Sequence, residues 1–319
     1  MATAVPLELK RLDQLRSKSK QVFDATPAPA KEVETWRRND FSFWRADSAL
    51  ASGRPMDAAA PSAELRGPGG AGDAAALSSL VPKLDELRRH GVVIQDLREA
   101  FQKYGRWIEP CLEPKTDGPL AKLELLNQVL WSQGVFVHIP PGLEVPMPIE
   151  IRFGESGPST HSFPRLIVAA GPESRSTLVR EHFGKAGRSV VCSDVLLEPG
   201  ARLDVSVCED LEPDSGYFSL ERCRLERDAH LSHSSVALGA AVHKSHLEVS
   251  LSGQGARSEI FGLVFGGGKQ HFDLNTKQHH LGKHTTSDLL YRTALQGQAR
   301  SIYTGMVRIE RDATQTEAY

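Results

Sequence analysis

Hydrophobic positions along the chain follow two different spacings, and the change falls near residue 134. Over residues 77–133 leucine recurs every three or four positions, as at Leu80, Leu84 and Leu87, which is the spacing of one face of an α-helix. From residue 134 to residue 319, short β-branched and aromatic runs are separated by glycine and proline, which is typical of strands and turns. The pattern predicts a helical region over 1–133 followed by a β domain over 134–319.

The first fifty residues are expected to form helix and loop. The segment TPAPAK at 26–31 should end the first helix, because proline lacks an amide donor and restricts the residue before it. Four aromatic side chains follow within nine positions, and we expect them to anchor this segment on the rest of the protein. They are Trp36, Phe41, Phe43 and Trp44.

Two further features are expected inside the helical region. Residues 51–76 are rich in alanine, glycine and proline and hold no aromatic residue, so they cannot offset their ordering entropy by burial and are interpreted as a flexible linker. A later helix is expected over 120–131, with Gly134 as its stop signal.

The β domain contains a repeated unit in which two short strands flank a turn. Anchoring each unit on the residue after the turn gives Arg175, Ala201, Ala229 and Ala256, at steps of 26, 28 and 27 residues. Later anchors at Ala299 and Ala313 follow at irregular steps of 43 and 14 residues.

A repeat of this length is too short to bury a core alone and must stack on its neighbours. A propeller blade needs about 40 residues and four strands, so the unit favours a parallel β-helix. A β-sandwich stays open as the alternative.

Charge and composition exclude several classes of protein. The 38 basic residues nearly balance the 40 acidic ones, whereas nucleic-acid or membrane-surface proteins usually carry a concentrated basic face. The basic stretch at 10–20 is interleaved with apolar residues and is interpreted as a solvated helix face. No apolar run has the length needed to cross a bilayer, and the N-terminus lacks the apolar core of a secretory signal. We expect no nucleic-acid or membrane partner and a cytoplasmic location.

The cysteines are Cys111, Cys192, Cys208 and Cys223, and none forms a C-x-x-C pair. This distribution fits reduced thiols rather than a disulfide framework. Strand alternation places Cys208 on the outer face beside Glu209 and Asp210, whose charges should disfavour the thiolate. We expect Cys223 to be buried and Cys111 and Cys192 to be structural.

Histidines gather in the segment 271–284 and supply the strongest candidate metal ligands. His279 and His280 are adjacent and should point to opposite faces of a strand, so only one can join His284. Because transition-metal sites use thiolate, imidazole or carboxylate ligands, His280, His284 and Cys208 are the candidate metal ligands. The alternative is that they are hydrogen-bonded structural or interface residues. GGGK at 266–269 lacks the spacing of a phosphate-binding loop and is interpreted as a turn.

Several segments together resemble the SufB/SufD family of the SUF iron–sulfur cluster assembly system. They are GVFVHIPPGLEVPMPIEI, the turns LEPGARLDV and SGQGARSEIFGLVFG, and LYRTALQGQARSIYTGMVRIERDATQTEAY. Pro27, Pro29, Glu34, Trp36 and Arg37 resemble the SufD side of the family, and family relatives also carry a histidine at the position of His280.

The resemblance implies an N-terminal helical region, a right-handed parallel β-helix and a C-terminal helical domain. It implies a scaffold subunit, not an enzyme, that pairs with a SufB-like subunit through β-helix edges and binds a SufC-like ABC ATPase through the C-terminal domain. No firmly bound cofactor is expected, and an iron–sulfur cluster would be held transiently by the complex.

The chain departs from the family pattern because it ends at Tyr319, before the final rungs and the C-terminal helical domain. The family's interface histidine and cysteine positions lie in that part and cannot be transferred to residues here. We therefore expect a fragment or a subunit without its ATPase-docking domain. Alternatives to the scaffold are a generic β-helical oligomerisation module, which includes a homodimer, and a carbohydrate-active β-helix enzyme.

Overall fold

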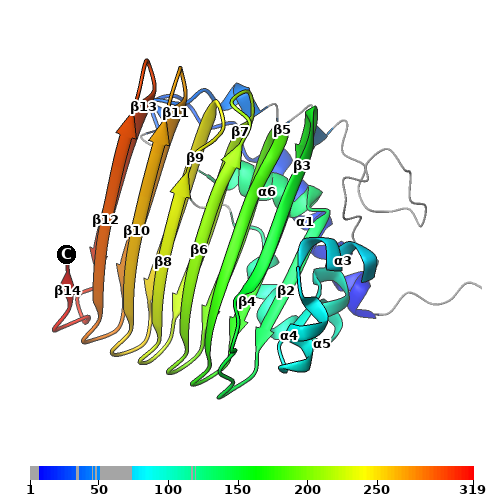
Figure 1. Ribbon diagram of the computed structural model, residues 1–319, viewed down its shortest axis with the longest axis vertical. Coiled ribbons are helices and arrows are strands. Elements are labelled where there is room, and N and C mark those ends of the chain that lie inside the picture. Colours follow the sequence, from blue (N-terminus) through cyan, green and yellow to red (C-terminus); the bar gives the residue numbers. More distant parts are fainter. Residues whose placement is uncertain are drawn as a thin grey trace, which may run out of the picture.

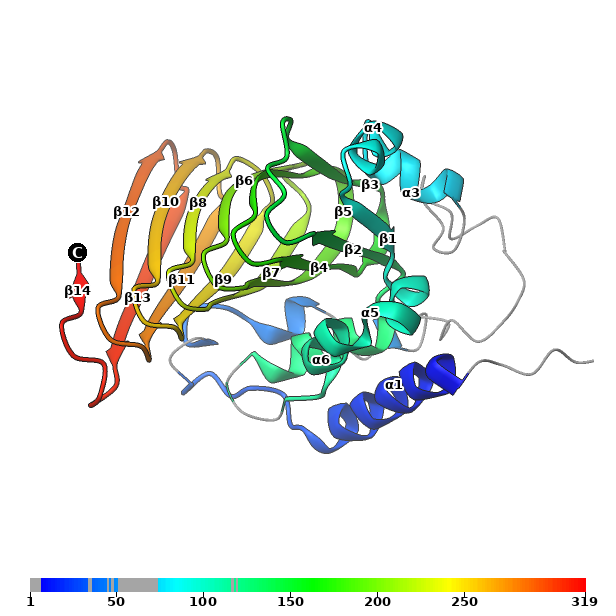
Figure 2. The ribbon, with the colours of Figure 1, turned by 90° about the horizontal axis from the view of Figure 1, so that it is seen from below.

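The computed structural model describes residues 7–33, 36–44, 46, 49–50, 74–115, 118 and 120–319. Its dominant feature is a β-solenoid with two facing walls; the strands of each wall run side by side in Figure 1, and Figure 2 shows the two walls facing each other. The strands are β1 (Val93–Asp96), β2 (Gln133–Ile139), β3 (Ile149–Ser162), β4 (Pro164–Ala170), β5 (Arg175–Leu197), β6 (Arg202–Leu211), β7 (Gly216–Leu225), β8 (His230–Ala237), β9 (Val242–Leu251), β10 (Arg257–Gly266), β11 (His271–His280), β12 (Thr286–Leu295), β13 (Arg300–Ile309) and β14 (Glu317–Ala318).

Strands pair with the second-next strand in sequence, and almost every pairing is parallel. One wall runs β6-β8-β10-β12-β14 and the other β7-β9-β11-β13, and the long strand β5 belongs to both because its first half pairs with β6 and its second half with β7. This order confirms the predicted parallel β-helix and excludes the β-sandwich, whose sheets are antiparallel. We call the first wall the even wall and the second the odd wall.

The interior between the walls is filled by the alternate residues of each strand. On β6 the buried residues Leu203, Val205 and Val207 pack with Val249 and Ile260 of later rungs in one apolar core. Because side chains alternate across a strand, the residues between them point outward. The apolar-x-apolar pattern of the sequence is therefore the pattern of the solenoid core.

One turn of each rung holds a residue with left-handed backbone conformation at the same place. These positions are Glu173, Gly200, Asp228, Gly255 and His284, with φ between 56° and 73°. Each donates its amide to a carbonyl of the next turn, as Gly200 does to Arg227 and Gly255 does to Lys283. The turns thus stack by hydrogen bonds just as the strands do, which sets the repeat length.

The residue after this position is the true repeat anchor, and it corrects the sequence-based anchors in two ways. The first anchor is Ser174 rather than Arg175, since Ser174 and Ala201 make the same backbone bond back across their turns. The predicted irregular steps arose because Ala299 belongs to the turns that lead into the odd wall, with Ser215 and Gln270. The anchors on the even-wall side are Ser174, Ala201, Ala229, Ala256, Thr285 and Thr316, which follows left-handed Gln315 and precedes β14; the predicted anchor Ala313 lies three residues earlier, at the position of Gly282.

Helices cover the outer face of the odd wall, on the lower side of Figure 2, and one end of the solenoid. They are α1 (Leu7–Ala25), η2 (Phe41–Trp44), α3 (Ala74–Leu80), α4 (Leu84–Arg89), α5 (Leu97–Leu112) and α6 (Ala121–Leu130). The predicted aromatic anchor is confirmed, because Trp36 and Trp44 are fully buried and the Trp44 ring lies 5.8 Å from that of Phe218 on β7.

Three expectations for the helical region need correction or lie outside the described residues. Val93–Asp96 form β1, which pairs antiparallel with β2 and so belongs to the sheet rather than to a helix. Gly134 lies inside β2, not at a helix end. A glycine is needed there because a Cβ would come 2.5 Å from the ring of Trp131. Of the predicted linker, 51–73 lies outside the described residues and 74–76 begin α3.

Strand alternation on β6 can be tested directly. Leu203 is 1% exposed and faces the core, whereas its neighbour Arg202 points outward. Leu203→Asp buries an unpaired charge and should lower the free energy of unfolding by more than about 4 kcal/mol. Arg202→Ser should change it by less than about 0.5 kcal/mol, measured by chemical denaturation. Equal losses in the two variants would contradict this strand register.

Candidate functional site

Cys208 lies on the outer face of β6, beside Glu181 of β5 and Val236 of β8. Burial, followed by the charges of Asp210, Glu181 and Glu209, raises the pKa of the Cys208 thiol. The predicted disfavouring of the Cys208 thiolate is therefore confirmed. Glu209, however, points inward and is buried. Cys208 is expected to stay protonated near neutral pH, which weakens it as a metal ligand.

His280 lies at the end of β11, and His284 lies in the turn between β11 and β12. His280 points into the solenoid from β11, where Nδ1 lies 2.8 Å from the Thr285 hydroxyl and Nε2 lies 3.0 Å from the Ser287 hydroxyl. Both ring nitrogens are therefore engaged by hydroxyl groups. His284 is exposed and occupies the left-handed turn position described above. The two imidazoles do not converge on one site.

The remaining cysteines are buried, as expected for structural residues. Burial raises the pKa of Cys192 to about 12 and also raises those of Cys111 and Cys223. Within the described ranges, no group of three His, Cys, Asp or Glu side chains could hold a metal ion. The part of this chain with unusual chemistry lies elsewhere, inside the solenoid.

A cluster of ionisable side chains occupies the middle of the solenoid. Arg180 of β5 pairs with Glu221 of β7 across 2.5 Å and donates to the Ser193 hydroxyl at 2.8 Å. His233 of β8 lies 3.4 Å from the same Glu221 oxygen. Although burial opposes ionisation, Arg180 and His233 hold the pKa of Glu221 below its ordinary range. Glu221 is thus a permanent anion that is held by a permanent cation.

In the same cluster, the pKa of Glu209 on β6 is shifted in the opposite direction to that of Glu221. Its carboxylate lies 3.4 Å from Nε2 of His243, which is itself uncharged because burial lowers its pKa to about 3. Burial raises the pKa of Glu209 to about 7. Glu209 lines a cavity of about 30 Å³ together with Arg180, Glu221, His233 and Tyr291. The cluster therefore holds one proton that is exchanged near neutral pH.

The sequence analysis missed this cluster, although one signal was present. Glu209 has the same strand parity as Leu203, Val205 and Val207, so alternation alone places it inside. Arg180 likewise shares its parity with buried Leu178. Their partners come from other rungs, and only the pairing register brings them together.

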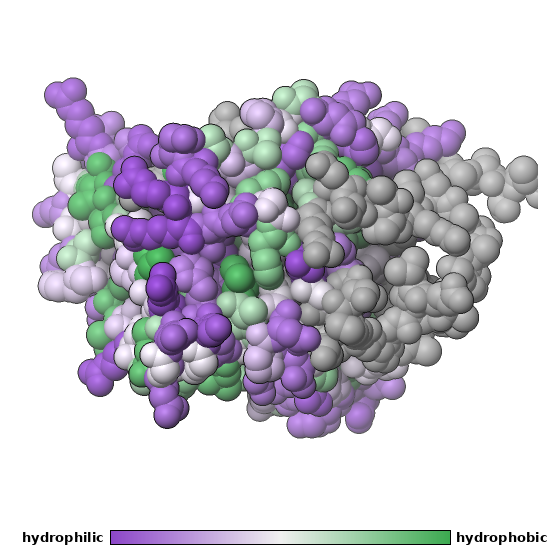
Figure 3. Space-filling model, turned by 90° about the horizontal axis from the view of Figure 1, so that it is seen from above, coloured by the Kyte–Doolittle hydropathy of each residue, from purple (hydrophilic) through white to green (hydrophobic). Residues whose placement is uncertain are grey.

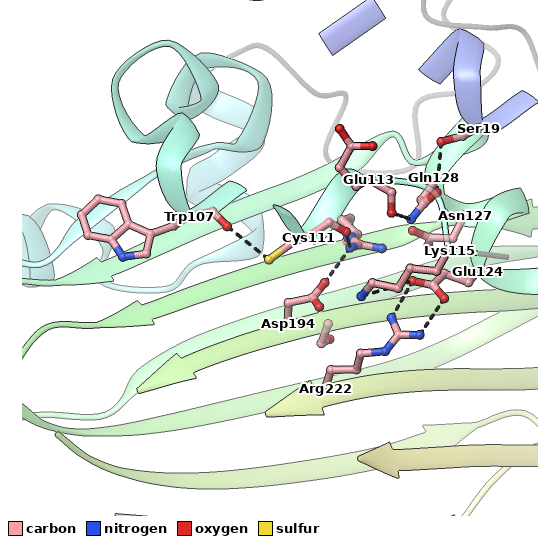
Figure 4. A network of polar contacts seen from close by, with 12 residues as sticks. Ser19, Trp107, Cys111, Glu113, Lys115, Glu124, Asn127, Gln128, Asp194 and Arg222 are labelled. Atoms are coloured by element: carbon pink, nitrogen blue, oxygen red, sulfur yellow. Dashed lines mark hydrogen bonds and ion pairs between the residues drawn. The ribbon is translucent and has the colours of Figure 1, made fainter. Parts of the chain in front are cut away.

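A second polar network joins the helices to the odd wall. Arg165 of β4 is buried between Asp194 of β5, at 2.6 Å, and the carbonyl of Cys111, also at 2.6 Å. Figure 4 shows Arg222 of β7 reaching Glu124 of α6, with two contacts of 2.5 and 2.7 Å. These pairs fix the helices on the wall, so this network is structural.

The two ends of the solenoid differ. At the first end β1 and the helices cover the core, whereas the last rung, formed by β12 and β13, leaves inward-facing apolar side chains exposed. The exposed fractions are 44% for Leu295, 50% for Val307 and 52% for Ile309. Figure 3 shows hydrophobic residues reaching the surface at this end, on the left of the view. None of the described residues covers the core there.

Among the described residues, no strand pairs with the outer side of β13. Arg300 donates its amide to Gln270 and Glu310 donates to His280, both toward β11. Amides alternate in direction along a strand, so those of Tyr303, Val307 and Ile309 point away from β11. On β12, β14 covers only the first two residues, Thr286 and Ser287. We call this edge and its exposed side chains the terminal rung.

Comparison with known proteins identifies the family. Residues 153–319, more than half of the chain, match the family described as "SUF system FeS cluster assembly, SufBD core domain". The chain belongs to the SufBD family. The match covers β4 to β14 and most of β3, so the interior cluster and the terminal rung both lie in the SufBD core domain.

This SufBD chain matches only part of the length of its curated relatives. A SufBD family protein of Mycobacterium leprae is 23% identical over 182 residues, which is 56% of this chain and 21% of the relative. A chloroplastic SufBD family protein of Arabidopsis thaliana is 25% identical over 245 residues, 71% of this chain and 43% of the relative. SufB of Bacillus subtilis is 21% identical over 239 residues, 72% of this chain and 50% of the relative. The chain thus spans half or less of their length.

Among the described helices, none is long and apolar enough to cross a membrane.

The turn role of His284 predicts a gain in stability on substitution. His284→Gly removes the strain of a left-handed residue without removing a packed side chain, so it should raise the free energy of unfolding by about 1 kcal/mol. Asp228→Gly, at the equivalent turn, is the matched control and should behave alike. Loss of stability in His284→Gly alone would show that the imidazole makes a contact that this account lacks.

The raised pKa of Glu209 predicts a pH dependence of stability. A carboxyl group with a folded pKa near 7 contributes stability that is complete below the unfolded value of about 4.3 and is lost as the pH rises through 7. Glu209→Gln removes this loss, so its stability relative to the parent should rise by roughly 2–3 kcal/mol between pH 4.5 and pH 8. Denaturation curves at several pH values measure the difference. Parallel pH profiles for the two proteins would refute the assignment.

Proposed function

We propose that this SufBD chain is a SufD-like scaffold subunit of iron–sulfur cluster assembly. It pairs with a SufB-like subunit through the terminal rung, within a complex that contains a SufC-like ABC ATPase. The family description and the names of the relatives support the process of cluster assembly. The specific partners and the scaffold role are the content of the proposal.

The observation that carries the proposal is the terminal rung, which the described residues leave exposed. A row of free amide and carbonyl groups beside exposed apolar side chains is a template for another strand. A second solenoid built of similar rungs would offer what both features need, a strand edge to pair with β13 and apolar side chains to cover its interior. Joining the two would continue both walls and bury Val307 and Ile309, which are each about half exposed here.

We infer a structural rather than a catalytic role for the chain itself. The interior cluster around Glu209 and Glu221 encloses a cavity of about 30 Å³, which has room for about one or two water molecules and not for a substrate. A larger groove of about 1060 Å³ lies between the helices and the odd wall, but its charged residues Glu124 and Arg222 are paired with each other. An iron–sulfur cluster would be held transiently, by groups that the complex brings together. The free thiols support a reducing compartment, and we place the complex in the cytoplasm.

Co-expression with a SufB-like and a SufC-like subunit tests this proposal. The chain should co-purify with both, and Val307→Lys should weaken its capture of the SufB-like subunit at least tenfold, because the joint would bury an unpaired charge. Thr304→Lys adds the same charge to the outward face of β13 and should have a smaller effect.

Two outcomes would count against the proposal. Recovery of neither subunit would remove the assigned role. A stable homodimer that excludes the SufB-like subunit would favour the generic oligomerisation module, and light scattering after size exclusion would distinguish it from the heteromeric complex.

A further inference from the structure

The interior cluster holds several buried polar atoms that have no partner among the described residues. Arg180 donates to Oε2 of Glu221, and Nε2 of His233 lies 3.4 Å from the same oxygen, whereas Oε1 of Glu221 has no hydrogen-bond partner. Nδ1 of His233 and Nε of Arg180 are also buried without one. All three side chains are more than nine-tenths buried. Because nearly all buried polar atoms in proteins are hydrogen-bonded, their concentration at one place indicates a further molecule that satisfies them.

These atoms belong to residues that surround one cavity. Arg180, Glu221 and His233 line it together with Glu209, and its volume is about 30 Å³. Three hydroxyl groups also line it, and they belong to Ser219 of β7, Ser235 of β8 and Ser245 of β9. The cavity therefore offers hydrogen-bond donors and acceptors from five strands, β5 to β9.

The size and charge of the cavity select what it can bind. It has room for about one or two water molecules, whereas organic ligands need pockets of about 300 Å³ or more. An ion would add a charge where Arg180 and Glu221 already neutralise each other, and an unpaired buried charge is strongly unfavourable. A neutral molecule that both donates and accepts hydrogen bonds fits these limits. Water is such a molecule, and polar cavities hold it whereas apolar cavities stay dry.

Tyr291 of β12 closes the cavity toward the terminal rung. Among the described residues that line the cavity, it is the one contributed by the last rung. Its ring leans back over the preceding rung, where a Cβ on Gly262 would come 2.0 Å from it. It packs against the apolar cluster that contains Ala237 and Val264, which also line the cavity. On its other side the ring of Tyr303, 5.0 Å away, is 41% exposed. Tyr291 thus separates the cavity from the exposed end of the solenoid.

We propose that this cavity is a binding site for one or two ordered water molecules, which donate to Oε1 of Glu221 and are retained by the ring of Tyr291. The water also gives the carboxyl group of Glu209 a hydrogen-bond partner, whether that group is protonated or ionised, because water both donates and accepts. It connects strands that the backbone does not pair, such as β6 and β7. The site lies inside the solenoid, so it stands or falls separately from the joint at the terminal rung.

Magnetic relaxation dispersion of water oxygen-17 tests the role of Tyr291, because it counts the long-lived internal water molecules of a protein in solution. Tyr291→Ala removes the ring and should let the water of this site exchange rapidly, so the count should fall by about one or two relative to the full unmodified chain. Tyr291→Phe keeps the ring and is the matched control, with an unchanged count. Circular dichroism shows that each variant is folded. Equal counts in the two folded variants would contradict the seal.

A high-resolution crystal structure of the unmodified chain locates the water directly, with one or two water peaks expected within about 3.2 Å of the polar atoms that line the cavity, Oε1 of Glu221 among them. Ser245→Val fills the cavity from β9 and should remove these peaks. It should also melt about 3 °C or more below Ser245→Ala, which keeps the space, because Oε1 loses its partner. A cavity without density, density of an ion, or a Ser245→Val variant more stable than Ser245→Ala would overturn the inference.

Discussion

The structure depends on the hydrogen bonds that run from one rung of the solenoid to the next. Each strand satisfies its backbone through the strands before and after it in its wall, and each turn donates to the turn beyond it. A rung cannot bury its own core, so stability is shared between neighbours. Such an arrangement needs a cap at each end. The helices and β1 provide one cap, and the described chain leaves the other end uncapped, which directs attention to the terminal rung.

The same constraint explains why the interior tolerates charges. Burying Arg180 and Glu221 costs desolvation energy that their attraction must repay, and the register holds them at 2.5 Å from adjacent rungs. Glu209 has no such cation at contact distance and stays protonated until near neutral pH. A slip of one residue would move every one of these groups to the opposite face. The interior cluster therefore destabilises any shifted strand register, and it also carries a titratable proton.

The fold could be predicted from sequence further than the sites could. Alternation on β6 and the turn spacing were enough to predict stacked rungs, and the aromatic anchor at Trp36 and Trp44 was predicted from apolar payload alone. The repeat was misaligned at Arg175 because the turn residue before it, Glu173, is not glycine although its backbone is left-handed. His284 was predicted to be a ligand because a histidine at a left-handed turn position, where glycine is usual, gives no sequence signal of its turn role. Pairs such as Arg180 with Glu221 join residues 41 positions apart, and no local pattern reports them.

The functional account rests on the claim that the terminal rung is a joint between two solenoids. The most direct measurement is amide hydrogen exchange over residues 300–309, with the chain alone and with a SufB-like subunit. The account predicts that amides of β13 that point away from β11 exchange much more slowly in the complex, while those that already donate to β11 change little. A complex that forms while exchange along β13 stays as it is in the free chain would contradict the claim.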